Sequence, residues 1–201
     1  KIFSAFSLPL SQVQYVLFGE SPYPRQASAN GYAFWDEAVV DLWSPTGLDK
    51  KVNRATSLRN MVKMLLIADG KLNPTNTSQD DIAVIDKSHY VKTNHEFFNN
   101  FLQQGFLLLN ATPVLQPGLP PQKDARAWHP FIKEVLQFLL ANKPQTQLIL
   151  FGKIAEKIDP LIADHPIKAL HAEHPYNLSF MTNSTVLAFF KKLKLLSIRV
   201  D

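Results

Sequence analysis

The chain has 201 residues, of which 46% are hydrophobic and 19% are charged, and its formal net charge at pH 7 is +4. This balance is typical of a folded globular protein and excludes a disordered chain, and no apolar run approaches the roughly 20 residues of a membrane-spanning helix. We therefore expect a single domain over residues 1–201. The mild positive charge permits a polyanionic partner without requiring one.

Cysteine is absent from the chain. Its absence excludes disulfides, iron–sulfur clusters and thiolate zinc sites, and it suits a reducing compartment. The first residues lack the apolar stretch and the cleavage site of a secretory signal. We therefore expect a cytoplasmic protein, or a nuclear one in a eukaryote. The chain does not begin with Met, so the start of the natural protein is left open.

Strands and helices are predicted to alternate along the chain. Short apolar runs that end at polar or turn residues predict buried strands over 13–18, 106–109, 148–151 and 167–171. Apolar residues at helical spacing predict helices over 57–66, 96–104, 126–141, 153–163 and 184–195. Alternation of this kind indicates a parallel sheet that is covered on both faces. We expect an α/β fold, a three-layer α/β/α sandwich around a four-stranded, mainly parallel sheet.

Two segments between these elements are predicted to be irregular. Residues 35–53 contain a turn at 44–47, and residues 70–93 form a polar surface excursion. Side chains that can cap a helix come before two of the predicted helices: Thr56 or Ser57 for the helix over 57–66, and Asn94 for the helix over 96–104.

Ligands of open parallel sheets bind beyond the carboxyl ends of the strands. Polar loops begin at these ends over 19–34, 110–123, 152–153 and 172–179. In the first, residues 19–24 read Gly-Glu-Ser-Pro-Tyr-Pro, and the two prolines exclude both helix and ladder pairing. An ordinary proline-rich loop would give the same pattern, so this stretch alone does not establish a site.

Two polar side chains in the later loops could act on a ligand. Asn110 follows three leucines at a strand end, where Asn is commonly a turn former; its functional interpretation is a carboxamide that presents a donor and an acceptor. His174 precedes a proline, and such a loop histidine is most often a solvated surface residue. Its functional interpretation is an electrophile or an acid–base group.

Other site types find little support in the sequence. His171, Glu173 and His174 could suggest metal ligands, but adjacent strand residues face opposite ways and no third histidine lies near them, so we expect no metal. No Walker loop, no G-x-S-x-G elbow and no G-x-G-x-x-G after a strand is present.

Taken together, these segments resemble the uracil-DNA glycosylase superfamily, most closely the branch whose water-activating loop reads G-Q-D-P-Y-H. The motifs that carry the resemblance occur in family order, at residues 19–24, 31–34, 56–61, 107–112, 127–128, 150–153 and 174–179. The match covers residues from about 13 to 195. It implies the superfamily's fold and an enzyme that removes a base from DNA.

The resemblance also implies roles for individual side chains. The target base has to be flipped out of the duplex, at a cost of a few kcal/mol, and Leu178 would enter the vacated stack. Phe34 would carry the flipped base, Asn110 would read its edge through two opposed hydrogen bonds, and Tyr23 would wall off the methyl group of thymine. His174 would donate to the uracil oxygen, an oxyanion-type contribution. Phosphates would be held without regard to sequence by Ser57, Gly152, Lys153 and Ser179.

The chain departs from the family pattern in its first loop. Where the family has its catalytic aspartate, this chain has Ser21, whose hydroxyl can hold a water but carries no charge near pH 7. Loss of such a group typically costs about 10²–10⁴ in rate. We hypothesise that Glu20, or a water held by Ser21, partly replaces the missing carboxylate. Pro24 and Asn177 also replace family residues, a histidine and a proline.

The resemblance predicts a monofunctional DNA N-glycosylase of base excision repair for uracil. We expect it to act without a cofactor, as a monomer, on single- or double-stranded DNA that contains a damaged base. Two alternatives stay open: a glycosylase for another deaminated or damaged base, and a catalytically weak or inactive DNA-binding relative.

Overall fold

The computed structural model describes residues 1–165 and 167–199. Their contacts divide the chain into two compact units, each made of two segments. Unit 1 comprises Lys1–Ala38 and Leu102–His171, and unit 2 comprises Val39–Phe101 and the segment from Ala172 onward. The single domain expected over 1–201 stays a prediction, and it includes residues 166, 200 and 201, which lie outside the described residues.

Unit 1 is built on a four-stranded parallel sheet. Its strands are β1 (Tyr15–Gly19), β4 (Phe106–Asn110), β5 (Gln147–Phe151) and β6 (Ala169–Ala172), in the order β4-β1-β5-β6. β1 runs parallel to both β4 and β5. The four predicted strands are therefore confirmed, with ends that differ by one or two residues, and so is the α/β class of the fold.

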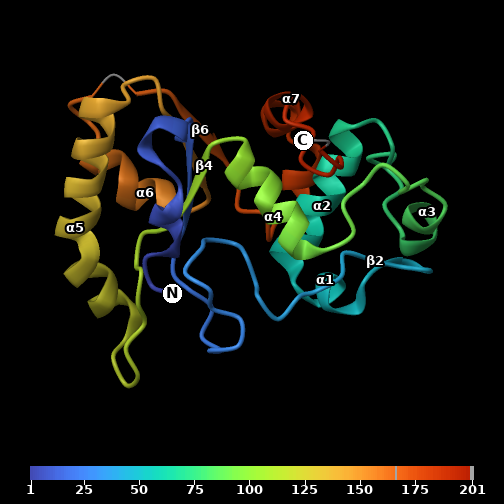
Figure 1. Ribbon diagram of the computed structural model, residues 1–201, viewed down its shortest axis with the longest axis horizontal. Helices are drawn as coiled ribbons and strands as arrows, with labels where there is room; N and C mark the ends of the chain where they lie inside the picture. The colour runs from blue at the N-terminus through green and yellow to red at the C-terminus, as the bar shows by residue number, and fades with distance from the viewer. Residues whose placement is uncertain (166, 200–201) are drawn as a thin grey trace. The chain divides into compact units, whose positions relative to one another are not determined.

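One face of the sheet is covered by α5 (Pro121–Asn142) and α6 (Ile154–Ile158), which Figure 1 shows beside the strands. Alternate strand residues point to this face, among them Phe18 and Leu109, and pack with Ile132 of α5. On the opposite face Leu17, Leu108 and Ile149 are also fully buried. Burial on both faces is what continuous apolar strands predict.

Two helices of unit 1 differ in length from the prediction. α5 begins five residues earlier than expected and contains Pro130. The predicted helix over 153–163 is shorter: α6 ends at Ile158, and a 3₁₀ turn η3 (Asp159–Leu161) follows. Pro160 explains this end, because proline has no N–H and restricts the residue before it. The N-terminal segment forms the 3₁₀ turns η1 (Ser4–Ser7) and η2 (Leu10–Gln12).

Unit 2 is mainly helical. Its described elements are the hairpin β2 (Trp43–Ser44) and β3 (Gly47–Leu48), α1 (Lys50–Arg54), α2 (Thr56–Ala68), α3 (Gln79–Ala83), α4 (Asn94–Gln103, whose last two residues belong to unit 1), η4 (Leu178–Thr182) and α7 (Ser184–Lys191). The predicted helices over 57–66 and 96–104 are present, and the one over 184–195 is present but ends at Lys191. None of the helices in the described ranges combines the length and apolarity needed to cross a bilayer.

The segments expected to be irregular contain short elements. Residues 35–53 hold the β2–β3 hairpin, with the predicted turn between its strands, and α1. Residues 70–93 hold α3, whose N-terminus is closed by a capping box of Ser78 and Asp81. These elements were missed because each strand or helix has at most five residues, too few to give a hydrophobic period.

Both predicted helix caps were wrong. The N-cap of α2 is Ala55, so Thr56 and Ser57 lie inside the first turn. At α4, Thr93 caps the helix: its hydroxyl accepts from Glu96 N at 3.1 Å, and the Glu96 carboxylate accepts from Thr93 N at 2.8 Å. This Thr-x-x-Glu box satisfies two backbone N–H groups at once, and Asn94 is the first helical residue.

Candidate functional site

The ends of β1 and β4 form the base of the candidate site in unit 1. The two strands pair along their full length, with Gly19 opposite Asn110. A Cβ atom at Gly19 would lie 2.5 Å from Asn110 Oδ1 and 2.8 Å from Ala33 Cβ. Only glycine permits this approach, and as a result the Asn110 carboxamide and the 31–34 segment lie next to each other.

The Asn110 carboxamide is the main polar group of this region. The residue is 5% exposed, and none of the hydrogen bonds found among residues 1–165 and 167–199 involves its side chain. A buried amide that lacks a partner is costly to a protein. The donor and the acceptor of this group are therefore available to a ligand.

Phe34 is held in an unusual backbone conformation. Its φ is +64°, in the left-handed region that residues other than glycine rarely adopt. Tyr23 Oη donates to the Phe34 carbonyl at 3.2 Å, and Ala33 N donates to the Leu108 carbonyl at 3.1 Å. Strained residues of this kind concentrate at functional sites, and here the strain is maintained by the first loop and by β4.

Tyr23 stays a neutral hydrogen-bond donor over a wide pH range. Burial raises the pKa of its phenol to about 12, and the nearby negative charge of Asp36 adds to the effect. Asp36 is itself buried, and Arg25 lies 3.9 Å from its carboxylate. The hydrogen bond from Tyr23 to Phe34 therefore persists at any pH near neutrality.

Glu20 and Ser21 are the two residues of the first loop considered as substitutes for the family's catalytic aspartate. The ladder continues past the strands, because Thr112 N donates to Glu20 O at 3.0 Å. Side chains alternate along it, so Glu20 lies on the other face of the sheet from Asn110. There its carboxylate pairs with Lys157 Nζ at 2.6 Å. This placement favours Ser21, of the two, as the residue that would hold a water.

The turn predicted to hold a phosphate follows β5. Gly152 has a φ of +73°, which glycine adopts without strain. Lys153 is exposed directly after it, and α6 begins at the next residue. The structure therefore presents a lysine and a glycine backbone at the carboxyl end of the sheet, as the sequence predicted.

In unit 2, the loop after β6 fixes the orientation of His174. Its Nδ1 accepts a hydrogen bond from Tyr176 N at 3.1 Å, so in the neutral ring the proton is on Nε2. Asn60 of α2 is fully buried, and its Nδ2 donates to the Pro175 carbonyl at 2.7 Å. Asn60 lies inside the 56–61 motif, but nothing in the sequence marks it as a support for this loop.

Leu178 projects from the same loop. It is 69% exposed, whereas Phe180 and Met181 in the same 3₁₀ turn are buried and anchor it. Burial disfavours ionisation of Glu173, but hydrogen bonds from a backbone N–H, from Ser179 and from Asn183 (2.7 Å) outweigh it and lower the pKa of that carboxyl. Glu173 thus ties the two ends of the turn together, and the Ser179 hydroxyl takes part in this tie.

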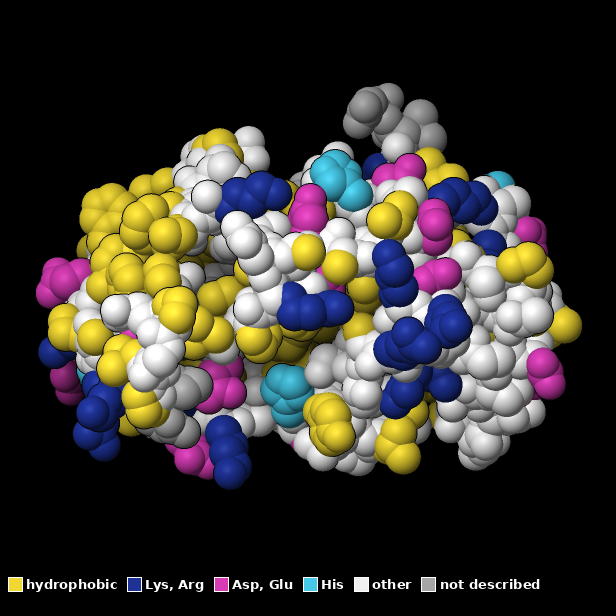
Figure 2. All heavy atoms as spheres, turned by 90° about the horizontal axis from the view of Figure 1, so that it is seen from below, with side chains coloured by type: hydrophobic (Ala, Val, Ile, Leu, Met, Phe, Trp, Pro, Cys, Tyr) yellow, Lys and Arg dark blue, Asp and Glu magenta, His cyan; other side chains and the backbone are white. Residues whose placement is uncertain are grey.

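Ser57 lies in the first turn of α2. No side chain caps this helix end, so its backbone N–H groups are available to an anion. Figure 2 shows Lys and Arg side chains gathered on the side of the molecule where α1 lies in Figure 1. The basic residues of α1 and α2 are Lys50, Lys51, Arg54, Arg59 and Lys63. Hydroxyl, helix end and positive charge together suit a phosphate.

The sequence-predicted residues divide between the two units. Unit 1 brings Tyr23, Phe34 and Asn110 together, and unit 2 places His174, Leu178 and Ser179 in one loop. The histidines and acids considered as metal ligands have separate partners: His171 Nε2 lies 3.0 Å from both carboxylate oxygens of Asp159. The described residues contain no group of three or more His, Asp or Glu side chains arranged to hold a metal.

Comparison with known proteins gives one consistent result. The crystal structure of wild-type UNG from Nitratifractor salsuginis is 41% identical to this chain, with a TM-score of 0.93, and the match covers 98% of this chain and 79% of that one. Uracil-DNA glycosylase from Azobacteroides pseudotrichonymphae is 27% identical over 176 residues, or 87% of this chain. The chain spans 66% of the length of that relative. No protein-family profile matches the chain.

A more distant match shows the fold alone. The crystal structure of mimivirus uracil-DNA glycosylase is 17% identical, with a TM-score of 0.55, and the match covers 87% of this chain and 54% of that one. At this identity the likeness concerns the arrangement of strands and helices and not the chemistry of the site.

Proposed function

Because this chain belongs to the uracil-DNA glycosylase superfamily, we propose that it is a DNA N-glycosylase that hydrolyses the bond between uracil and its deoxyribose, the first step of base excision repair. The observation that carries the proposal is the Asn110 carboxamide, which is buried beside the strained Phe34 segment and is without a side-chain partner among the described residues. A nucleobase edge with one donor and one acceptor matches such a group.

Base selection follows from the side chains of unit 1. A uracil on the ring of Phe34 can pair its carbonyl with Asn110 Nδ2 and its N–H with Asn110 Oδ1, whereas cytosine, which presents an amino group and an acceptor, pairs only if the carboxamide is turned over. Tyr23, whose hydroxyl is fixed on the Phe34 carbonyl at 3.2 Å, is the candidate for excluding the methyl group of thymine. Unpaired buried polar groups make such discrimination steep.

Bond cleavage leaves negative charge on the departing uracil and positive charge on the sugar. We assign His174 as the donor to the uracil oxygen, since its Nδ1 is occupied by Tyr176 N and its Nε2 therefore carries the proton in the neutral ring. A donor aimed at developing charge stabilises the transition state more than the ground state. Water completes the reaction by adding to the sugar carbon, and the proton that it loses is balanced by the one that the uracil anion takes up, so the products are uracil and an abasic sugar.

The proposed water site is at Ser21. A hydroxyl can orient a water through a hydrogen bond but offers no negative charge to the sugar cation. We therefore expect a slower enzyme than one with a carboxylate at this place, by about 10²–10⁴. For the same reason an inactive DNA-binding relative is the second candidate function, and a glycosylase for another damaged base is the third.

DNA contacts are proposed for both units. Leu178, exposed on an anchored turn, would fill the space left by the flipped base. The α2 helix end at Ser57, the Gly152–Lys153 turn and Ser179 would hold phosphates. The expected form of the protein is a monomer.

Single-turnover release of uracil tests the proposal. Enzyme in excess is mixed with oligonucleotides that carry one uracil, both single-stranded and paired, and released base is followed over time. We expect release from both substrates, and near-complete loss of release in Asn110→Ala and His174→Ala. Release by the wild-type protein that does not exceed that of these variants would contradict the proposal. DNA binding without release would favour the second candidate, and a panel of hypoxanthine, xanthine and alkylated substrates tests the third.

A further inference from the structure

Unit 1 contains a cavity that the proposed chemistry does not use. It has a volume of about 480 Å³ and lies between α5 and α6. Ala111 forms part of its wall and Asn110 does not. Because successive strand residues face opposite ways, the cavity opens on the other face of the sheet from the Asn110 carboxamide.

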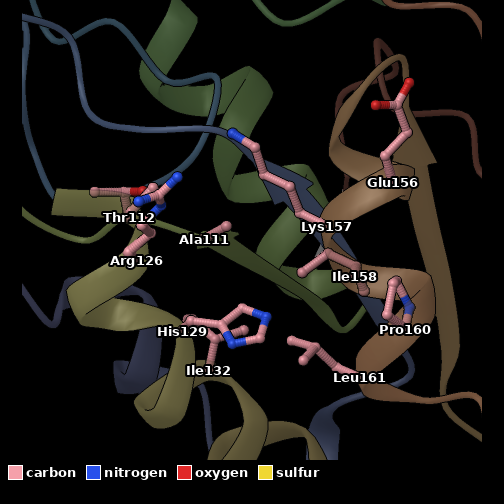
Figure 3. A pocket seen from close by; sticks show the side chains of 11 residues that line it. Ala111, Thr112, Arg126, His129, Ile132, Glu156, Lys157, Ile158, Pro160 and Leu161 are labelled. Atoms are coloured by element: carbon pink, nitrogen blue, oxygen red, sulfur yellow. The ribbon is translucent and has the colours of Figure 1, made fainter. Parts of the chain in front are cut away.

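The cavity combines an apolar floor with basic side chains. Figure 3 shows the imidazole of His129 projecting between α5 and α6, with Arg126 beside Thr112 at one end. Glu156 also lines the cavity, and in the same view its carboxylate points away from His129. The floor is formed by the apolar lining residues, which are Ala111, Ala125, Ile132, Ile158, Pro160 and Leu161.

Two of the basic groups have their hydrogen-bonding capacity unused. Arg126 and His129 lie three residues apart on α5 and therefore on one side of the helix. In the part of the chain that the structure describes, neither side chain takes part in a hydrogen bond or an ion pair. Lys157, the third basic residue, already pairs with Glu20 at 2.6 Å. Arg126 and His129 are thus the groups free to receive an anion.

The position of the cavity relates it to DNA. α6 begins at Ile154, directly after the Gly152–Lys153 turn to which we assign a phosphate, and its next turn lines the cavity. A strand held at the turn can therefore continue along α6. The volume lies within the range of small-ligand sites, and a nucleotide has the matching chemistry: an anionic phosphate for the rim and a flat base for the floor.

We propose that this cavity is a second nucleotide subsite, which takes an undamaged nucleotide of the bound DNA strand, with its phosphate between Arg126 and His129 and its base on the apolar floor. This inference rests on the part of the proposed function that concerns DNA binding, and it does not depend on release of a base. Its effect is to add affinity for single-stranded or opened DNA outside the uracil.

The salt dependence of DNA binding tests the phosphate contact. The probe is a fluorescein-labelled oligothymidylate of about 12 nucleotides, without uracil, and its affinity is measured by anisotropy between about 50 and 200 mM salt. Loss of one phosphate contact lowers the slope of log K against log salt by about 0.7 for a single strand. We expect this change in Arg126→Ala, with binding several-fold weaker. Lys133→Ala, which removes an exposed charge from the same helix outside the cavity, is the control and should leave the slope unchanged.

A filling variant tests entry of the base. Ala125 lines the cavity from α5, and Ala125→Trp fills the space while every charge is kept. A probe with 4-thiothymidine is crosslinked by light, and the attached peptides are identified by mass spectrometry. We expect crosslinks to α5 or α6 in the wild-type protein and their loss in Ala125→Trp. Circular dichroism checks that each variant is folded. If Ala125→Trp does not fold, the binding measurements on Arg126→Ala alone decide whether the subsite exists.

The outcomes separate the subsite from the enzyme activity. If Arg126→Ala binds the probe with wild-type affinity and slope, or if wild-type crosslinks fall outside α5 and α6, the subsite is refuted, whatever the rate of uracil release. If the wild-type protein releases no uracil but Arg126→Ala weakens binding and the α5 crosslinks are found, the subsite stands and the proposed activity fails.

Discussion

The hydroxyl of Tyr23 donates to the main-chain carbonyl of Phe34 at 3.2 Å. One phenol therefore links the loop after β1 to the residue that adopts φ = +64°. The side chain proposed to exclude thymine and the ring proposed to carry uracil are held by the same hydrogen bond. Binding of the base is thus expected to weaken when this bond is lost, whereas exclusion of thymine depends on the ring of Tyr23 itself.

Tyr23→Phe removes the hydrogen bond and keeps the ring. We expect the free energy of unfolding to fall by about 1 kcal/mol and uracil release to slow several-fold, because Phe34 is less firmly held, while thymine stays excluded by the remaining ring. Urea unfolding and excision assays measure the two effects. Tyr32→Phe is the control: it removes a hydroxyl that contacts Ser7 at 3.0 Å and not the base site. Equal rates for the two variants would show that the bond to Phe34 has no part in catalysis.

Ser21→Asp restores a negative charge at the proposed water site. We expect uracil release to rise by about 10² or more, since a positioned carboxylate contributes about 10²–10⁴. Single-turnover kinetics at neutral pH measure it. Ser21→Asn is the control: asparagine has the size of aspartate without its charge, and this variant should release uracil no faster than the wild-type protein. If both variants are as slow as the wild-type protein, Ser21 does not occupy the position of the family's aspartate.

Asn60→Ala tests how the His174 loop is held. The variant leaves the Pro175 carbonyl without its 2.7 Å partner in a buried place, which is expected to cost about 1–3 kcal/mol of stability. Uracil release should fall in the chemical step, with substrate binding less affected, because His174 is displaced. Asn100→Ala is a matched control, since it removes a similar buried bond to Leu195 O at 2.8 Å, away from the loop. If Asn60→Ala and Asn100→Ala lose kcat to the same extent under conditions in which both variants are folded, Asn60 has only a structural role.

Leu178→Ala tests the proposed insertion of this side chain into the space left by the flipped base. Since Leu178 is 69% exposed, its loss should change the free energy of unfolding by less than about 0.5 kcal/mol. Release of uracil from duplex DNA should fall more than release from a single strand, because only the duplex has a stack to fill. The ratio of the two rates is the measurement. Val84→Ala, which removes a side chain of a residue that is 85% exposed, should leave that ratio unchanged.

Alkaline pH should destabilise the fold through two phenols. Burial raises the pKa of both Tyr23 and Tyr90 to about 12, with nearby carboxylates adding to the effect, whereas the unfolded value is about 10. Between these values the folded state keeps protons that the unfolded state releases. The free energy of unfolding is therefore at its full value below pH about 10 and falls as the pH rises toward about 12. Urea titrations across this range should show the fall, and Tyr23→Phe should make it shallower.

Much of the fold could be predicted because three strands of the sheet, β1, β4 and β5, are almost entirely buried. β4 and β5 are nearly continuous apolar runs, and the glycines and the asparagine at strand ends mark where each run stops. The short elements of unit 2 could not be predicted, because α3 and the β2–β3 hairpin are fixed by side-chain caps and by contacts such as Gln79 Oε1 with Leu48 N at 2.7 Å, which leave no period in the sequence.

The candidate site divides in a similar way. Residues at strand ends, such as Asn110, could be predicted from their position after an apolar run. The Glu20–Lys157 pair could not, because it joins residues 137 apart. Nor could the support of His174 by Asn60, since a buried asparagine inside a helix resembles any other polar helical position until its partner carbonyl is placed.

The close packing around Gly19, which has no side chain, also limits how this protein could be redesigned. Because the Asn110 carboxamide and Ala33 already fill the space where a Cβ would be, no substitution at Gly19 can enlarge the base site. An engineer who wants to admit a larger lesion must shorten Tyr23 or Phe34 instead, and so must give up either the side chain proposed to exclude thymine or the ring proposed to carry the base.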